Sequence, residues 1–149
     1  MDELACFYAG KRVFITGHTG FKGTWLTQVM ILSGATVAGF SLPKSHLNSH
    51  FEGLNLRDKI THYEGDIRDA SALHNAISEF KPDVVFHLAA QALVKLAYAS
   101  PSDTFETNVM GSLYLLQAVQ ACPSIKSLVY VTSDKCYENV EWIWGYKET

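Results

Sequence analysis

A glycine-spaced turn between two apolar segments constrains this chain more than any other feature. Residues 12–16 are apolar and β-branched, as in a strand, and residues 24–32 carry apolar side chains at near-helical spacing. Gly17, Gly20 and Gly23 lie between them. Gly17 suits a tight turn, Gly20 lets the backbone approach a pyrophosphate, and Gly23 lets the helix and the strand pack closely. The N-terminus of the helix presents unpaired N–H groups to phosphate. The turn predicts a nucleotide cofactor site, with an ordinary strand–helix turn as the alternative.

Strand-like segments recur along the chain with helix-compatible segments in most of the gaps. Several of these strands are continuously apolar, which is typical of a parallel sheet covered by helices on both faces. The 149 residues, nearly half of them apolar, favour one globular domain spanning 1–149. We predict a doubly wound, Rossmann-type α/β fold that is incomplete at its C-terminal side, with strands at 12–16, 36–41, 60–64, 83–88 and 126–132.

Two helices are predicted in the second half of the chain. Asp69 is placed to cap a helix that ends before Pro82. A longer helix should run from about Asp103 to Ala121. Its expected buried stripe consists of Val109, Leu113 and Leu116, with Met110 and Val119 alongside. Residues 42–59 are predicted to form a loop with one short helix.

Composition argues against several classes of protein. The net charge is −3 and no basic run occurs, so nucleic acid binding is not expected. The acidic N-terminus and the lack of a long apolar run argue against export and membrane insertion, which favours the cytoplasm. The spacing of the cysteines and histidines favours neither disulfides nor a metal site.

The ends of the second and third strands offer candidates for binding adenosine. Asp66, with Ile67 beside it, follows the third strand and is placed to meet the adenine amino group, although it could be a solvated turn residue. Ser41 ends the second strand, where a hydroxyl can bond the ribose. This favours NAD over NADP, although Lys44 keeps NADP open.

Three side chains of the glycine turn are further candidates for cofactor contact. Phe21 lies in the turn, Lys22 could lie near the pyrophosphate, and His18 could donate a hydrogen bond to it. The alternative is that they point into solvent while the backbone binds the cofactor.

The fifth strand leads into Ser133, Asp134 and Lys135 at the same edge of the sheet. A hydroxyl, a carboxylate and an amine in succession bring together an acid and a base, which elimination chemistry requires. A surface ion pair between Asp134 and Lys135 is the alternative.

Several motifs together resemble one enzyme family. Residues 17–23 (GHTGFKG), 87–91 (HLAAQ), 107–111 (TNVMG), 133–139 (SDKCYEN) and 141–146 (EWIWGY) are similar to the CDP-glucose 4,6-dehydratases of the extended short-chain dehydrogenase/reductase superfamily. The resemblance implies oxidation of the hexose at C4 by NAD+, loss of water across C5 and C6, and return of the hydride to C6. The product would be a 4-keto-6-deoxy sugar nucleotide for deoxysugar and O-antigen synthesis.

The resemblance also implies roles for individual residues. Ser133 would bond the C4 oxygen, Asp134 would protonate the departing C6 hydroxyl, and Lys135 would take the C5 proton. Asn108 would shape the active site, although it could instead be a helix cap. The wall beside the nicotinamide ribose would comprise Leu88, Ala89 and Ala90, with His87 either there or in the core.

The chain departs from this family in one respect, because it contains no Tyr-x-x-x-Lys pair. We therefore expect the N-terminal, NAD-binding part of a homo-oligomeric enzyme acting on CDP-glucose, with its substrate domain elsewhere and no activity of its own. Another nucleotide-sugar epimerase or dehydratase, or a non-catalytic NAD-binding module, are alternatives. Trp142 and Trp144 would stack on the sugar nucleotide or lie on one face of a strand.

Overall fold

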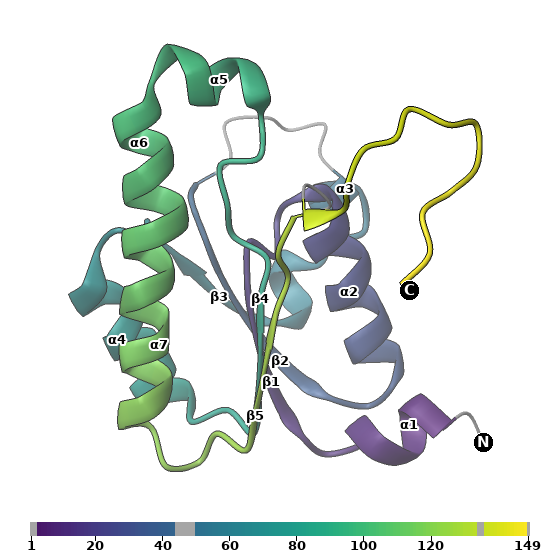
Figure 1. Cartoon of the computed structure of the whole chain (residues 1–149). Coiled ribbons are helices and arrows are strands. Elements are labelled where there is room, and N and C mark those ends of the chain that lie inside the picture. Colours follow the sequence, from purple (N-terminus) through teal and green to yellow (C-terminus); the bar gives the residue numbers. More distant parts are fainter. Residues whose placement is uncertain (1–2, 44–49, 134–135, 149) are drawn as a thin grey trace.

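The computed structural model describes residues 3–43, 50–133 and 136–148. Its centre is a parallel sheet of five strands in the order β3-β2-β1-β4-β5 (Figure 1). The doubly wound, Rossmann-type fold is thus confirmed, and the observed strands end within two residues of the predicted ones. They are β1 (Arg12–Thr16), β2 (Thr36–Ser41), β3 (Thr61–Glu64), β4 (Val84–His87) and β5 (Ser127–Tyr130).

Strand β1 lies at the middle of the sheet and sends side chains into two separate apolar clusters. Phe14 packs with residues of α4 (Ala70–Phe80) and α7 (Gly111–Ala121) on one face. Val13 and Ile15 pack on the other face with Met30 of α2 (Phe21–Leu32). All three β1 side chains are fully buried, which explains why the strand is continuously apolar instead of alternating.

Helix α4 begins and ends as the sequence predicts. The Asp69 carboxylate accepts a hydrogen bond from the Ala72 backbone N–H at 2.9 Å and so caps the first turn. The helix ends at Lys81, which takes a left-handed conformation with φ of 50° immediately before Pro82. Its buried face consists of Leu73, Ala76, Ile77 and Phe80.

The helix predicted over 103–121 is a longer and less regular structure. It comprises α6 (Pro101–Phe105), a π-helical turn, η2 (Glu106–Met110), and α7, and it is preceded by α5 (Val94–Ala99), which the sequence did not predict. The predicted stripe is wrong at Val109, Met110, Leu113 and Leu116, which are exposed. Its remaining member, Val119, is partly buried against the core. The π turn shifts the helical phase, and the buried face of α7 is built instead from Gly111, Ser112, Leu115 and Ala118.

The shorter elements lie outside the sheet. Helix α1 (Glu3–Tyr8) was not predicted, whereas the 42–59 region contains the expected short helix, α3 (His50–Gly53), and a 3₁₀ turn, η1 (Arg57–Lys59). Among the described residues, no helix combines the length and apolar character needed to cross a membrane.

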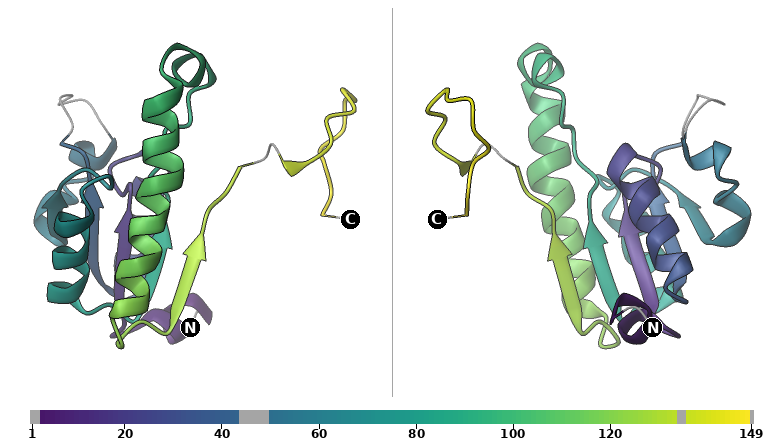
Figure 2. Two further views of the ribbon diagram at one scale, coloured as in Figure 1. Left: turned by 60° about the vertical axis from the view of Figure 1, so that its left-hand side comes forward. Right: turned by 90° about the vertical axis from the view of Figure 1, so that its right-hand side faces the viewer.

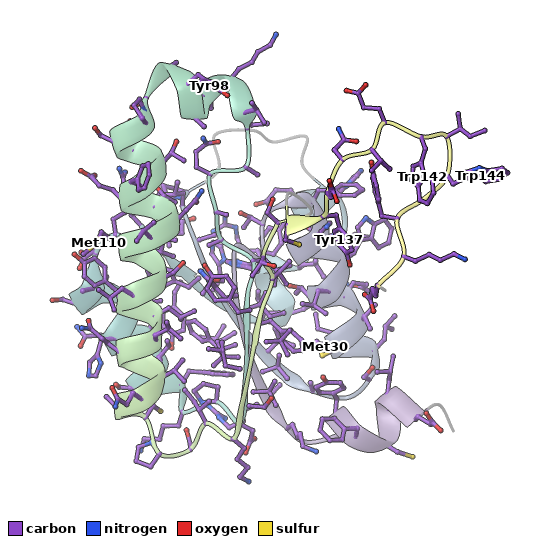
Figure 3. The ribbon with its side chains drawn as sticks, viewed as in Figure 1. Met30, Tyr98, Met110, Tyr137, Trp142 and Trp144 are labelled. Atoms are coloured by element: carbon purple, nitrogen blue, oxygen red, sulfur yellow. The ribbon has the colours of Figure 1, made fainter. Side chains whose placement is uncertain are left out.

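The segment 136–148 extends away from the sheet and forms no regular strand or helix (Figure 2). Trp142 and Trp144 lie on it with more than half of their surface exposed (Figure 3). The strand alternative for these two residues is therefore wrong, and their stacking on a sugar nucleotide stays a prediction.

Candidate functional site: a cofactor cleft at the carboxyl edge

A cleft of about 420 Å³ opens where the parallel strands end. Its position matches the crevice that binds ligands in doubly wound sheets. Eight of the predicted cofactor-binding residues line it: Gly17, Gly20, Ser41, Asp66, Ile67, Leu88, Ala89 and Ala90. The sequence did not single out the other six, which are Thr19, Leu42, Pro43, Gly65, Arg68 and Thr107. Two of these, Thr19 and Thr107, lie inside the motifs that carry the family resemblance, and Gly65 and Arg68 flank the predicted pair Asp66 and Ile67.

The glycine turn leaves no room for larger residues. Gly17 has a φ of +71°, and a Cβ on it would lie 2.8 Å from the backbone N of Ala89. A Cβ on Gly23 would lie 2.1 Å from the Gly17 carbonyl oxygen, so helix and turn pack backbone to backbone. The result is an open cradle at the start of α2, whose first N–H groups lack intrahelical partners. The cradle suits the phosphates of a dinucleotide.

His18 faces away from this cradle. Its side chain is fully buried, and its Nε2 lies 2.7 Å from Nδ1 of His62 on β3. A Cβ at position 39 of β2 would come within 2.2 Å of the His18 ring, so Gly39 makes the space that the ring occupies. The predicted hydrogen bond from the His18 ring to a pyrophosphate is therefore wrong. The ring packs over β2 instead, because Gly39 has no side chain to block it.

Other residues of the turn differ in their access to the cleft. Phe21 and Lys22 are exposed at the start of α2 and are not among the residues that line it. Ser41 does line it, and its hydroxyl lies 2.9 Å from the Thr19 hydroxyl. This contact joins the end of β2 to the glycine turn. Contact of these residues with a cofactor stays a prediction.

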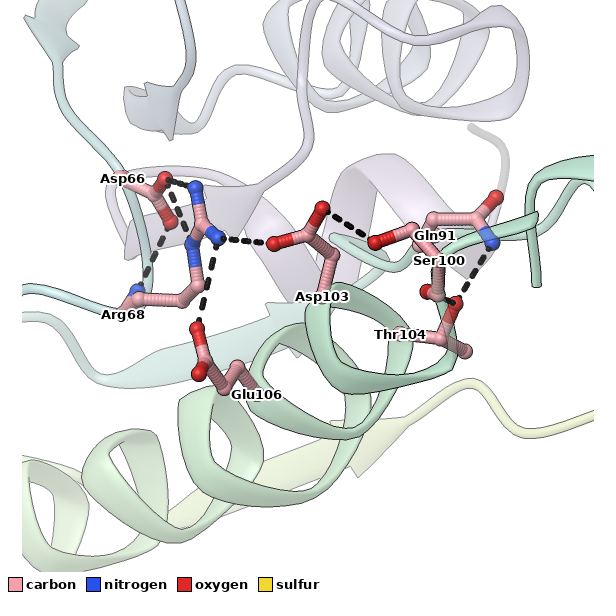
Figure 4. Close-up of polar contacts among 7 residues, drawn as sticks. All are labelled: Asp66, Arg68, Gln91, Ser100, Asp103, Thr104 and Glu106. Atoms are coloured by element: carbon pink, nitrogen blue, oxygen red, sulfur yellow. Dashed lines mark hydrogen bonds and ion pairs between the residues drawn. The ribbon is translucent and has the colours of Figure 1, made fainter. Parts of the chain in front are cut away.

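Asp66 is held by a neighbouring arginine that also reaches the long helix (Figure 4). Its carboxylate accepts hydrogen bonds from Nε and Nη2 of Arg68 at 2.9 and 2.7 Å, and these hold the pKa of Asp66 below its ordinary value. Arg68 also pairs with Asp103 and Glu106, at 3.4 and 3.7 Å. Asp66 is therefore an ionised acceptor, which suits an adenine amino group.

Asn108 fastens the chain that follows β4. It lies in the π turn, where its Oδ1 accepts from the Gln91 N–H at 2.8 Å and its Nδ2 donates to the Gln91 carbonyl at 3.0 Å. It is therefore not a helix cap. Its position fixes the segment that leads out of Leu88, Ala89 and Ala90.

His87 is buried below that segment, between β1 and α7. Its Nδ1 lies 2.6 Å from the Thr16 hydroxyl, and its Nε2 lies 3.2 Å from the Ser112 hydroxyl. Burial lowers the pKa of His87 to about 4, so the ring is neutral near pH 7. Of the two alternatives for this residue, the hydrogen-bonded core histidine is the one observed.

The predicted catalytic triplet falls at a boundary of the described residues. Ser133 is exposed, three residues beyond the end of β5. Asp134 and Lys135 lie outside the described residues, so their roles stay predictions. Within the described part of the chain, no group of three or more His, Cys, Asp or Glu side chains could hold a metal ion.

Comparison with known proteins decides the family. The family model described as GDP-mannose 4,6 dehydratase matches residues 14–149. The chain belongs to the GDP-mannose 4,6-dehydratase family. This dehydratase-family chain is 52% identical to the CDP-glucose 4,6-dehydratase of Salmonella typhimurium over 142 residues. The match covers 95% of this chain and 40% of that relative.

Solved structures agree on the fold of this dehydratase-family chain. It is similar to the epimerase Mth375 of Methanothermobacter thermautotrophicus, with a TM-score of 0.82 and 27% identity over 98% of this chain and 42% of that one. It is also similar to the UDP-glucose 4-epimerase of Thermus thermophilus in complex with NAD. That match has a TM-score of 0.68 and 31% identity, and covers 78% of this chain and 36% of the epimerase.

Proposed function

We propose that this chain is the NAD-binding part of a dehydratase that converts CDP-glucose into CDP-4-keto-6-deoxyglucose and water. The observation that carries the proposal is the 52% identity to the Salmonella CDP-glucose 4,6-dehydratase. The chain spans 40% of that relative, so the activity is proposed for a protein of that length. The proposal includes action in the cytoplasm, in deoxysugar and O-antigen synthesis, a homo-oligomeric enzyme, and a separate substrate domain.

The cleft fits a dinucleotide. Gly17 and Gly20 line the cleft, and buried Gly23 lets the start of α2 pack against the Gly17 carbonyl. The first N–H groups of α2 would hold the pyrophosphate there. Asp66 would accept from the adenine amino group, and Ser41 would bond the ribose. Leu88, Ala89 and Ala90 would form the wall beside the nicotinamide ribose. NAD+, when bound, supplies a hydride acceptor that is regenerated within each turnover.

The residues after β5 would carry the proton transfers. Ser133 would donate to or accept from the C4 oxygen and so hold the hexose against the cleft. Lys135, in its neutral form, would take the C5 proton, and Asp134, protonated, would give its proton to the leaving C6 hydroxyl, which departs as water. Lys135 would return a proton to C5 when the hydride adds to C6, so it ends each turnover neutral. The proton that the C4 hydroxyl releases on oxidation balances the one that Asp134 gives to the departing water, and exchange with solvent restores Asp134.

Isotope transfer tests the reaction against the alternatives. With the full-length protein, CDP-glucose deuterated at C4 should lose one water and give a product that carries the deuterium at C6. An epimerase would instead return a hexose of unchanged mass. A protein that binds NAD+ but leaves CDP-glucose, GDP-mannose and UDP-glucose unchanged would support the non-catalytic module.

Two lysines on either side of β5 make a matched pair of variants. Lys135→Ala should lower kcat by about a thousandfold, which is within the range for loss of a general base. Lys126→Ala removes an exposed lysine that pairs with Asp83 at the opposite end of the strand and should leave kcat unchanged. Unchanged turnover in Lys135→Ala would contradict the proton-abstraction role.

Calorimetric titration of this chain with NAD+ and NADP+ tests the cofactor separately. We expect saturable binding of NAD+ and weaker binding of NADP+, because the lining residues at the end of β2 offer a hydroxyl and no arginine for a 2′-phosphate. Tighter binding of NADP+ would contradict the assignment of NAD.

A further inference from the structure

A chain of side-chain hydrogen bonds crosses from the middle of the sheet to its edge. It runs from Thr16 on β1 to His87 on β4, then to Ser112 on α7 and to Tyr130 on β5. The three contacts measure 2.6, 3.2 and 2.6 Å. Thr16, His87 and Ser112 are buried. None of the four residues lines the cleft.

The direction of every bond follows from the number of protons available. The Thr16 hydroxyl accepts from the backbone N–H groups of Leu88 and Ala89, both at 3.2 Å, so its own proton goes to Nδ1 of His87. The neutral His87 ring therefore carries its proton on Nε2 and donates it to the Ser112 hydroxyl. This tautomer is assigned by the network.

The far end of the chain is determined in the same way. The Ser112 hydroxyl donates to the Asn108 carbonyl at 2.7 Å, so the Tyr130 hydroxyl must donate to Ser112. Within the chain each donor then has one acceptor, and the hydroxyl oxygens of Thr16 and Ser112 each accept two bonds. Reversing any one bond alone would leave two donors or two acceptors facing each other at another contact.

The chain connects the two parts that the proposed reaction must bring together. At one end, Thr16 holds the N–H groups of Leu88 and Ala89 in the cleft wall. At the other end, Tyr130 stands three residues before Ser133. A backbone bond from the Val131 N–H to the His87 carbonyl, at 3.0 Å, ties the same two strand ends. Strand β5 is an edge strand with β4 as its one strand neighbour among the described residues.

We propose that Thr16, His87, Ser112 and Tyr130 are positioning residues, which set the segment carrying Ser133 at a fixed distance from the cofactor-cleft wall. The inference rests on the proposed dehydratase function. Loss of a link should impair the alignment of the reacting groups more than the binding of the sugar nucleotide, because misplacement by a fraction of an ångström lowers rate more than affinity.

Removal of single hydroxyls in the full-length protein tests this inference. Tyr130→Phe should lower kcat about tenfold and leave KM for CDP-glucose within about twofold. Thr16→Val should lower kcat to a similar extent and also weaken NAD+ binding several-fold, because the Ala89 N–H loses its acceptor and the Leu88 N–H keeps only the Thr16 carbonyl. Thr16→Ser keeps the hydroxyl and should restore both values.

Tyr114→Phe is the matched control. Tyr114 lies on the same helix as Ser112 but lines the groove between α4 and α7, with His74 and Gln117. Its loss of a hydroxyl should leave kcat and NAD+ affinity unchanged. Thermal unfolding of each variant shows whether a change in rate accompanies a change in stability.

The double variant Thr16→Val/Tyr130→Phe tests whether the four residues act as one unit. A single chain predicts a loss of about tenfold, close to either single variant, whereas two independent contacts predict the product, about a hundredfold. A product-like loss overturns the inference. Unchanged kcat in Tyr130→Phe overturns it as well.

The test separates this inference from the proposed function. A wild-type protein that neither binds NAD+ nor dehydrates CDP-glucose overturns the proposed function, and the inference with it. An active wild type whose variants keep full activity overturns the inference alone. If Thr16→Val does not fold, Ser112→Ala combined with Tyr130→Phe takes its place in the cycle.

Discussion

Helices α4 and α7 pack side by side on one face of the sheet, but they bury different kinds of surface. Helix α4 buries four apolar residues, Leu73, Ala76, Ile77 and Phe80, and starts at a side-chain cap. Helix α7 buries one large side chain, Leu115, among Gly111, Ser112 and Ala118. Leu113 and Leu116 are exposed, and Tyr114 and Val119 are partly buried against the core. Small residues bring α7 close to the cleft, and the close approach places Ser112 against His87.

The largest effect should separate two adjacent leucines of α7. Leu115 is 0% exposed and Leu116 is 46% exposed. Leu115→Ala should lower the free energy of unfolding by about 4 kcal/mol, because it leaves a cavity in the core. Leu116→Ala should change it by less than about 0.5 kcal/mol. Urea unfolding of both variants is the measurement, and equal losses would refute the observed phase of the helix.

The next effect concerns the pKa of buried His87, which bonds to Ser112 of α7. Because the folded-state pKa is about 4 and the ordinary value is 6.5, the unfolded chain binds a proton between these pH values and the folded chain does not. The contribution of neutral His87 to the free energy of unfolding is therefore complete above pH 6.5, and it is lost as the pH falls to 4. It amounts to at most about 3 kcal/mol.

Unfolding of wild type and His87→Gln across this range isolates the contribution from that of the carboxylates. The difference in stability between the two proteins should shrink as the pH falls from about 7 to about 4. A difference that does not vary with pH would mean that burial does not depress the pKa of His87.

A smaller effect should link the packing of α7 to the cleft. A Cβ on Gly111 would lie 2.8 Å from Cγ1 and Cδ1 of Ile67, which lines the cleft. Gly111→Ala should destabilise the fold by about 1 to 2 kcal/mol, after the gain in helix propensity, and weaken NAD+ binding several-fold. Gly53→Ala, where a Cβ would meet nothing within 4 Å, is the control for calorimetry.

The smallest effect belongs to α4. Asp69→Ala removes the bond to the Ala72 N–H and should cost about 1 kcal/mol of folding stability. Asp69→Asn should recover most of it, because an amide oxygen also caps a helix. Thermal unfolding of the two variants is the check, and NAD+ affinity should stay constant in both.

The contrast between the two helices also shows what could be predicted from sequence. The strands, the glycine turn and the α4 cap depend on local patterns, and each was predicted within about two residues. The buried face of α7 depends on the π turn before it and on which neighbouring residues pack closely against the helix. The pattern of apolar residues in the sequence indicates neither of these. Leu115 and Leu116 are chemically identical in the sequence, so the pattern alone could not choose between them.

The residues of the cleft also differ in how far the sequence could predict them. Gly17, Asp66 and Ala89 could be placed because they stand at strand ends, where topology alone brings them together. The direction of the His18 ring could not be predicted, because it depends on a glycine, Gly39, in a different strand. Arg68 stood beside Asp66 in the sequence, but its reach to Asp103 and Glu106 requires the two elements to be folded together.

The burial of His18 has a consequence for protein engineering. The first turn of the cradle is anchored through its own histidine to Gly39 on β2 and to His62 on β3. A graft of residues 12–32 into another parallel sheet would therefore carry the glycine turn without the two residues that hold the His18 ring in place. The smallest portable unit is three strands wide, and an acceptor sheet needs a glycine and a histidine at the equivalent places.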